Sequence, residues 1–180
     1  MIRGAIRLAL VGAGISYALD RILKEQAQGA EPEPIESMIV IDARIERVWE
    51  VVADVAGQPR WMSDMKAVRL GSADPVGVGT SGVADVRILG LTVADRVTVT
   101  EFDPPHRFAI RHEGTFKGHG LITLEAGAGG TTTIVRWEEL LIPPVLPHLA
   151  ALAMTPTLAG VFQADLVRLK ELVEAGSPAA

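Results

Sequence analysis

The sequence predicts an α+β protein in which a curved antiparallel β-sheet wraps around a long C-terminal helix and leaves a cavity between them. Nearly all of residues 37–142 reads as short strands separated by glycine-rich turns. Residues 157–174 instead place apolar side chains at steps of three and four, the spacing of one helical face. Because an isolated helix of this kind is only marginally stable, its apolar face is expected to bury against the sheet. That face consists of Leu158, Val161, Phe162, Leu166, Leu169 and Val173.

Length, charge and cysteine content limit the classes of function. The 180 residues suit one domain with additional terminal segments. The formal net charge of −5 argues against a nucleic-acid partner, which usually calls for a basic surface. The absence of cysteine excludes a disulfide framework, a thiolate nucleophile and cysteine-ligated metals, and it is compatible with a cytoplasmic location.

Residues 1–29 differ in composition from the rest of the chain. An uncharged apolar run at 8–19 follows Arg3 and Arg7, and it is shorter than the roughly 20 residues that a membrane-spanning helix needs. Three interpretations fit this segment: a helix that packs on a surface or a partner, a membrane-associated anchor involving residues 5–23, or a cleaved secretory signal. An anchor would hold the otherwise cytoplasmic protein at a membrane.

The remaining boundaries follow from composition. Residues 30–36 contain two prolines and several acids, which is typical of a linker. The main domain is therefore predicted at 37–175, and residues 176–180 form a short tail.

The elements of this domain are predicted from the period of the apolar residues. A strand at 38–41 is followed by helical spacing at 45–55, and a second short helix is expected to begin at 60–62. The period then returns to two, with breaks at glycines and prolines. The expected strands are 68–70, 82–89, 91–102, 107–113, 116–125 and 131–141.

Several short motifs, spread in order between Ile35 and Glu174, carry a resemblance to a known family. They read VWEVVAD, PRWM, GVGT, FDPPHRF, GGTTTIVRW and LVRLKELVE. Together they resemble the START/Bet v 1-like (SRPBCC) superfamily, in its polyketide cyclase/dehydrase-like branch. The resemblance implies a helix-grip fold, an antiparallel sheet curled around a C-terminal helix over a hydrophobic cavity. It also implies a small apolar ligand such as a lipid, an isoprenoid quinone or a polyketide, and only some members are enzymes. Residues 1–29 lie outside it as an extra N-terminal helix.

The cavity of such a fold would be lined by the inward faces of the strands and of the last helix. The sequence offers eleven candidates, of which Trp61 comes from the expected second short helix and the other ten lie on these faces: Val86, Val97, Phe108, Ile110, His112, Trp137, Leu152, Leu158, Phe162 and Leu166. Residues 142–158 are strongly apolar, and Pro156 is expected to kink the helix there. This segment is either the upper half of the gripping helix or an apolar gate that borders the cavity mouth.

His112 and Asp95 are the two candidates for acid–base chemistry. His112 shares a strand face with Phe108 and Ile110, so it either hydrogen-bonds a ligand or is a core histidine with a protein partner. Asp95 shares a face with apolar residues, and a buried carboxylate is costly without a partner. We expect it to pair with Arg96 or Arg111, the alternative being a raised pKa suited to catalysis.

The last strand adds an ambiguity of register at Arg136–Glu139. The more apolar face favours Trp137 in the cavity with Glu139 near its rim. No histidine and acid spacing matches a metal site, so neither a metal nor a cofactor is predicted.

The sequence therefore favours a binding module or carrier for a small hydrophobic molecule over an enzyme, because no general acid and base pair is evident. Two alternatives stay open. One is a cyclase or dehydratase that uses His112 or Asp95 as acid–base, and the other is a membrane-tethered adaptor that handles lipid or quinone. The oligomeric state is not predicted.

Overall fold

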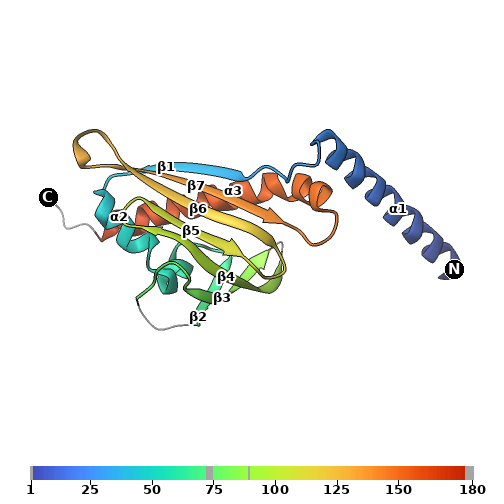
Figure 1. The fold of residues 1–180 in the computed structure, drawn as a ribbon, viewed down its shortest axis with the longest axis horizontal. Coiled ribbons are helices and arrows are strands. Elements are labelled where there is room, and N and C mark those ends of the chain that lie inside the picture. The colour runs from blue at the N-terminus through green and yellow to red at the C-terminus, as the bar shows by residue number, and fades with distance from the viewer. Residues whose placement is uncertain (1, 72–74, 89, 177–180) are drawn as a thin grey trace.

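The computed structural model contains seven strands that form one antiparallel sheet in the order β1-β7-β6-β5-β4-β3-β2 (Figure 1). It describes residues 2–71, 75–88 and 90–176. The elements are α1 (Ile2–Gln26), β1 (Ile35–Ile41), α2 (Ile45–Val52), η1 (Val55–Arg60), β2 (Met65–Leu70), β3 (Ser81–Ile88), β4 (Leu91–Asp103), β5 (Arg107–His112), β6 (Lys117–Ala126), η2 (Ala128–Gly130), β7 (Thr133–Ile142) and α3 (Pro147–Ala175).

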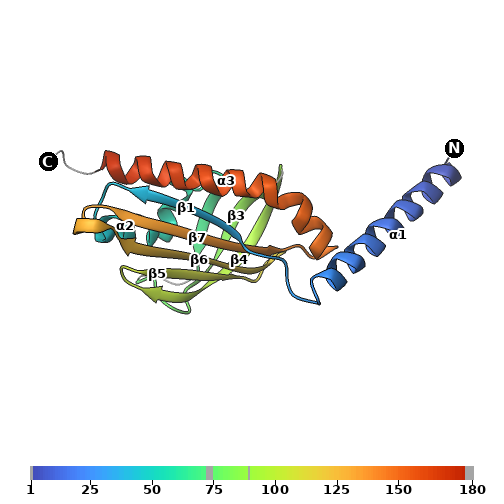
Figure 2. The ribbon, with the colours of Figure 1, turned by 90° about the horizontal axis from the view of Figure 1, so that it is seen from above.

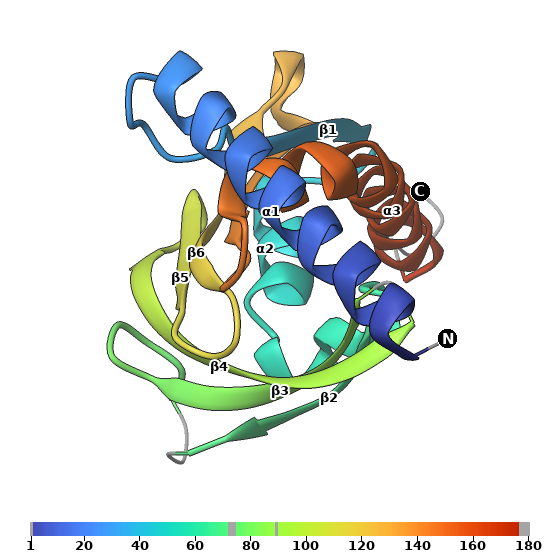
Figure 3. The same cartoon turned by 90° about the vertical axis from the view of Figure 1, so that its right-hand side faces the viewer.

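The sheet curves strongly, and α3 and α2 lie on its concave side (Figure 3). Strands β2 to β7 follow one another as antiparallel neighbours, and β1 completes the sheet by pairing with β7. The predicted α+β helix-grip fold, with an additional N-terminal helix, is confirmed.

The core forms where α3 and α2 face the sheet. Helix α3 buries Leu158, Leu166, Leu169 and Val173, which belong to the face predicted from the sequence. Helix α2 and the sheet contribute the other buried residues, which include Ile41, Val48, Val52, Leu124 and Val135. Each fully buried aliphatic side chain of this size contributes about 1.5–3 kcal/mol, so packing against the sheet stabilises α3.

The helical region after β1 is shorter than predicted. Helix α2 ends at Val52, and the Asp54 side chain accepts a hydrogen bond from Gly57 N (3.0 Å), which closes a tight turn. A 3-10 helix, η1, follows at once. The predicted second helix beginning at 60–62 is therefore wrong, because the helical turn ends at Arg60 and Trp61 turns into the core.

Helix α3 continues through Pro156, and Figure 2 shows its N-terminal part bending away from the rest of the helix. Proline removes one helical hydrogen bond and displaces the preceding turn, which accounts for a bend at this place. Among the described residues, α3 alone is long and apolar enough by composition to cross a membrane. Its C-terminal half packs on the sheet, so this finding is weak evidence for a span.

Helix α1 projects from the domain and contacts α3 (Figures 1 and 2). The contact is specific, since Asp20 Oδ1 accepts hydrogen bonds from His148 N (2.9 Å) and Leu149 N (3.0 Å). These are free N–H groups of the first turn of α3, whose own N-cap residue, Leu146, provides no side-chain acceptor. Asp20 therefore caps α3 from another helix.

Candidate functional site

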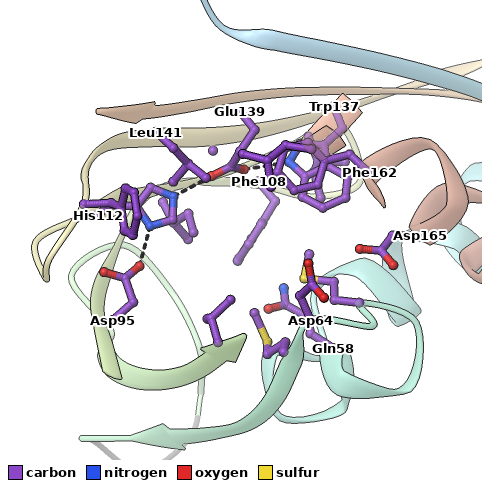
Figure 4. Close-up of a pocket in the computed structure, with 18 residues that line it drawn as sticks. Gln58, Asp64, Asp95, Phe108, His112, Trp137, Glu139, Leu141, Phe162 and Asp165 are labelled. Atoms are coloured by element: carbon purple, nitrogen blue, oxygen red, sulfur yellow. Dashed lines mark hydrogen bonds and ion pairs between the residues drawn. The ribbon is translucent and has the colours of Figure 1, made fainter. Parts of the chain in front are cut away.

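A cavity of about 100 Å³ lies between the sheet and α3 (Figure 4). A smaller lobe of about 50 Å³ adjoins it beneath β2 to β5 and shares several lining residues. A third, narrow space lies between residues 32–35 and α3 and shares Glu139, Leu141 and Leu158 with the main cavity. The main cavity is lined by Gln58, Met62, Asp64, Met65, Val86, Asp95, Phe108, Ile110, His112, Phe116, Gly120, Ile122, Trp137, Glu139, Leu141, Leu158, Phe162 and Asp165.

Most of the candidates proposed from the sequence lie around this cavity. Those that line it are Val86, Phe108, Ile110, His112, Trp137, Leu158 and Phe162. Val97 lines the adjoining lobe instead.

Three candidates do not line the cavity. Trp61 and Leu166 are completely buried in the core, where Trp61 packs edge-to-face on Trp137 with ring centroids 5.8 Å apart. Leu152 lies on the surface of α3 with 63% of its area exposed. The helical period places Leu152 on the outer side of the bent N-terminal segment, so its assignment to the cavity was wrong.

Three titratable side chains meet at one end of the cavity, and we call Asp95, His112 and Glu139 the acid–histidine triad. His112 Nδ1 lies 2.6 Å from Asp95 Oδ2, and His112 Nε2 lies 2.5 Å from Glu139 Oε1. All three residues are buried, with 6%, 9% and 5% of their areas exposed, respectively. The imidazole therefore bridges two carboxylates that come from different strands.

The sheet register explains how these side chains reach one another. Asp95 is on β4 and precedes Val97, the residue that pairs with His112 of β5. Glu139 is on β7, and β6 lies between β5 and β7. At the crossing, β6 has Gly120, which pairs with Ile110 on one side and with Glu139 on the other.

Glycine at position 120 is required for this contact. A Cβ atom there would lie 2.5 Å from Glu139 Oε2, well inside van der Waals distance. A Cβ at Gly114 would likewise overlap the Asp95 carboxylate. Two positions without a side chain thus leave room for the two carboxylates of the triad.

The partner of Asp95 differs from the one expected. Arg111 was a predicted partner, but it alternates with His112 along β5, points outward and pairs with Glu113 (2.6 Å). Arg96 likewise follows Asp95 directly on β4, where successive side chains point to opposite faces. Inside the sheet, the cation that Asp95 meets is the imidazole of His112.

The electrostatics of the triad favour a charged histidine. Burial by itself would lower the pKa of His112, but the hydrogen bonds to Asp95 and Glu139 and their negative charges outweigh it and raise the pKa to about 10. His112 is therefore an imidazolium at neutral pH, and both of its N–H groups donate to carboxylates.

Aromatic rings connect the triad to α3. Trp137 Nε1 donates a hydrogen bond to Glu139 Oε2 (2.8 Å), so the carboxylate is held from two sides. The Trp137 ring packs on Phe162 of α3, with centroids 4.8 Å apart. The position of Glu139 is thus tied to the packing of α3 against the sheet.

A second polar group, which we call the opposite polar wall, consists of Gln58, Asp64 and Asp165 and lies across the cavity from the triad (Figure 4). Asp165 accepts a hydrogen bond from Ser63 N (2.9 Å) and pairs with Arg168. Burial and the nearby Asp165 charge raise the pKa of Asp64 above its usual value. Within the described residues, no group of three or more histidine or acidic side chains has the geometry of a metal site.

Comparison with models of known protein families shows the family to which this chain belongs. The model of the family described as polyketide cyclase / dehydrase and lipid transport matches residues 34–174. The chain belongs to this family. None of the curated proteins matches the sequence significantly.

Several solved structures have the same fold as this protein, although their sequence identity to it is low. A START superfamily protein from Mycobacterium smegmatis has 15% identity and a TM-score of 0.66, over 81% of this chain and 100% of that one. A protein from Thermus thermophilus has 20% identity and a TM-score of 0.65, over 81% and 99%. A Deinococcus radiodurans protein has 19% identity and a TM-score of 0.61, over 80% and 99%. At these identities the similarity shows the fold alone.

Sequence reasoning missed several residues of the site in this family member. Glu139 was placed near the rim, but it is buried within the triad. Gly120, Gln58, Asp64 and Asp165 were not singled out at all. The sequence does carry a signal for Glu139, which shares one face of β7 with Trp137. It also carries one for Gly120, because the Gly-His-Gly sequence of β6 leaves the inward positions without side chains.

Proposed function

We propose that this protein binds a small hydrophobic ligand in the cavity between the sheet and α3, as a binding module or carrier. The observation that carries this proposal is the cavity itself, whose walls are mostly aliphatic and aromatic and whose polar groups gather at two ends. Ligand sites of this kind are typically apolar with a few polar groups that fix orientation. Membership of a family described in part by lipid transport supports the same function.

The size of the cavity limits the part of a ligand that fits inside. A dry, engineered apolar cavity of about 150 Å³ accommodates benzene. The main cavity of about 100 Å³ and its lobe of about 50 Å³ together suit one ring or a short chain. A longer lipid or isoprenoid would need to extend through the narrow space between residues 32–35 and α3.

The second candidate function is acid–base catalysis on a polyketide-like substrate, as in a cyclase or dehydratase. The buried triad beside the cavity is the observation that favours it. Both N–H groups of His112 are already donated to protein carboxylates, so His112 cannot reach a ligand directly in this arrangement. Proton exchange would run through a carboxylate, which makes binding the better-supported function.

A cavity-filling substitution tests the binding function. Val86 lines the cavity, and Val86→Phe should occupy its space and weaken the binding of p-cresol, a one-ring probe, by at least about tenfold. Val83→Phe is the matched control, because it lies on the same strand but alternates to the other face. Calorimetric titration measures both variants against the unaltered protein.

Two outcomes would contradict the proposal. One is equal binding by Val86→Phe and the unaltered protein. The other is a lack of any ligand in two assays together: no p-cresol binding, and no small molecule released on denaturation of the natively purified protein when it is examined by mass spectrometry.

We further propose that α1 associates with a membrane surface. Ile15, Tyr17, Leu19 and Ile22 each expose nearly half or more of their area on this helix, although all are large and apolar. An amphipathic or apolar helix outside a globular domain gains free energy by inserting such residues into the lipid interface. Asp20, which caps α3, would then connect the membrane-bound helix to the part of α3 near the cavity.

The expected result is loss of vesicle binding when apolar residues of α1 become charged. The Ile15→Glu, Leu19→Glu double variant should remain in the supernatant when the protein is sedimented with vesicles of phosphatidylethanolamine and phosphatidylglycerol. Val40→Glu, at an exposed position of β1, is the control and should sediment as the unaltered protein does. If the unaltered protein does not sediment with vesicles, or if the double variant still does, the membrane association is wrong.

A further inference from the structure

The side chains that line the cavity have almost no hydrogen-bond donors to offer a ligand. His112 uses both ring N–H groups on Asp95 and Glu139, and Trp137 uses its indole N–H on Glu139. The Gln58 amide already donates to a backbone carbonyl, so one N–H of that group is left. The other lining side chains are carboxylates or apolar groups.

Acceptors, in contrast, are in excess. A carboxylate can accept about four hydrogen bonds, and Glu139 accepts two from described residues. Asp95 Oδ1 is also buried without a hydrogen-bond partner among the described residues, but it lies against Gly114 on the side away from the cavity, so Glu139 is the acceptor of the triad that a ligand can reach (Figure 4). The opposite polar wall adds the carboxylates of Asp64 and Asp165. A ligand entering this cavity therefore meets unfilled acceptors at both ends.

The cavity also carries an excess of negative charge, which favours a donor in the same way as the free acceptors do. In the triad, one imidazolium faces two carboxylates, which leaves an excess of negative charge in a buried place. On the opposite polar wall, Arg168 pairs with Asp165, and Asp64 is partly exposed with Lys66, Arg87 and Arg168 nearby, so the excess of buried negative charge lies at the triad. Buried charge without full compensation is costly, so a positive group brought by a ligand would be strongly favoured.

We propose that the ligand is a small apolar molecule that carries a hydrogen-bond donor at one end, and that its best form is a protonated amine on a one-ring or short aliphatic body, with the donor directed at Glu139. This inference rests on the proposed binding function and specifies its ligand class. An oxidised quinone brings carbonyl acceptors only, and a fatty acid adds a second negative charge, so both complement the cavity poorly.

Four probes that share one ring separate the possibilities: toluene, p-cresol, 4-methylbenzylamine and 4-methylbenzoate. Their dissociation constants are measured at pH 7 on the 180-residue chain by calorimetry or by ligand-observed NMR. The amine and the cresol should bind at least about tenfold more tightly than toluene, since one charge-assisted hydrogen bond is worth at least this factor. The benzoate should bind most weakly.

Each outcome decides between this inference and the function on which it rests. Toluene or benzoate binding as tightly as the amine would overturn the donor inference and leave hydrophobic binding intact. Failure of all four probes would overturn the donor inference, and the binding function would fall with it only if no small molecule were released on denaturation of the natively purified protein either.

A charge-neutral variant adds a second test at the proposed contact. Glu139→Gln keeps an acceptor oxygen near His112 but removes the charge, so it should reduce the preference for the amine over toluene by about tenfold and change cresol binding less. Glu138→Gln, the neighbouring residue on the other face of β7, is the matched control and should keep the preference. An unchanged preference in Glu139→Gln, with toluene binding retained as evidence of folding, would overturn the contact with Glu139.

Discussion

Replacing His112 by leucine is expected to lower the free energy of unfolding by about 3–5 kcal/mol, which is typical for removing one partner from a buried ion pair. The substitution leaves the carboxylates of Asp95 and Glu139 facing each other in a buried cavity without the cation that separates them. The loss arises mainly from these uncompensated groups, because leucine fills a similar volume. Chemical denaturation at pH 7, with the midpoint and slope analysed together, measures it.

The controls separate the charge effect from the change of side chain. His119→Leu replaces an exposed histidine of the neighbouring strand β6 and should change stability by less than about 0.5 kcal/mol. The triple variant with leucine at positions 95, 112 and 139 removes the charges together and should be more stable than His112→Leu alone. A triple variant that is less stable than the single one, or a His112→Leu protein as stable as the His119→Leu control, would contradict this account of the triad.

The fold could be predicted because its determinants are local patterns. The periods of apolar residues, the glycine-rich turns and the face of α3 that carries Leu166, Leu169 and Val173 are all visible along the chain. Alternation also assigns each strand residue to a face, which is why Phe108, Ile110 and His112 were expected on the concave side, where they line the cavity. A one-residue error in register would have moved all of them to the other face.

The triad could not be assembled in the same way, because its members are brought together by register between strands. Asp95 and Glu139 are far apart in the chain, and their meeting at His112 depends on the pairing of β4, β5, β6 and β7. It also depends on Gly120, whose missing side chain opens the path across β6. Sequence alone suggested arginines beside Asp95, but side chains that alternate along a strand cannot turn to the same face.

The N-terminal part of α3 shows a different limit. The apolar composition of residues 142–158 left two interpretations open, the upper half of the gripping helix or an apolar gate, and it predicted a bend at Pro156. Composition gives no direction to individual side chains, however, and in the structure Leu152 lies outside while Leu158 lines the cavity. No sequence pattern predicts that Asp20 of α1 caps α3. The acceptor, Asp20, and the donors, the backbone N–H groups of His148 and Leu149, are separated by most of the chain.

The stability of the protein is expected to fall by several kcal/mol as the pH rises from about 6.5 to about 10. The pKa of His112 in the folded state is raised to about 10 from its usual value of 6.5. Between these two values the folded state binds one more proton than the unfolded state, so the stabilisation is complete below the lower value and is lost through the upper one. One proton corresponds to a slope of at most about 1.4 kcal/mol per pH unit.

The groups whose pKa values are lowered, and the arginines whose pKa values are raised, titrate outside this window. The carboxyls of Asp85, Glu101, Glu113 and Glu174 titrate at lower pH, and the guanidinium groups of Arg69 and Arg107 titrate at higher pH. The pKa of Asp64 is raised, so the comparison with His112→Leu identifies the part of the slope that belongs to His112. Denaturation at intervals from pH 6 to 10 gives the slope, and the His112 ring resonances in NMR spectra should shift with a midpoint well above pH 8. His112→Leu should abolish the slope while His119→Leu keeps it. A flat profile in the unaltered protein would mean that His112 is neutral, and it would remove the charge that makes its loss costly.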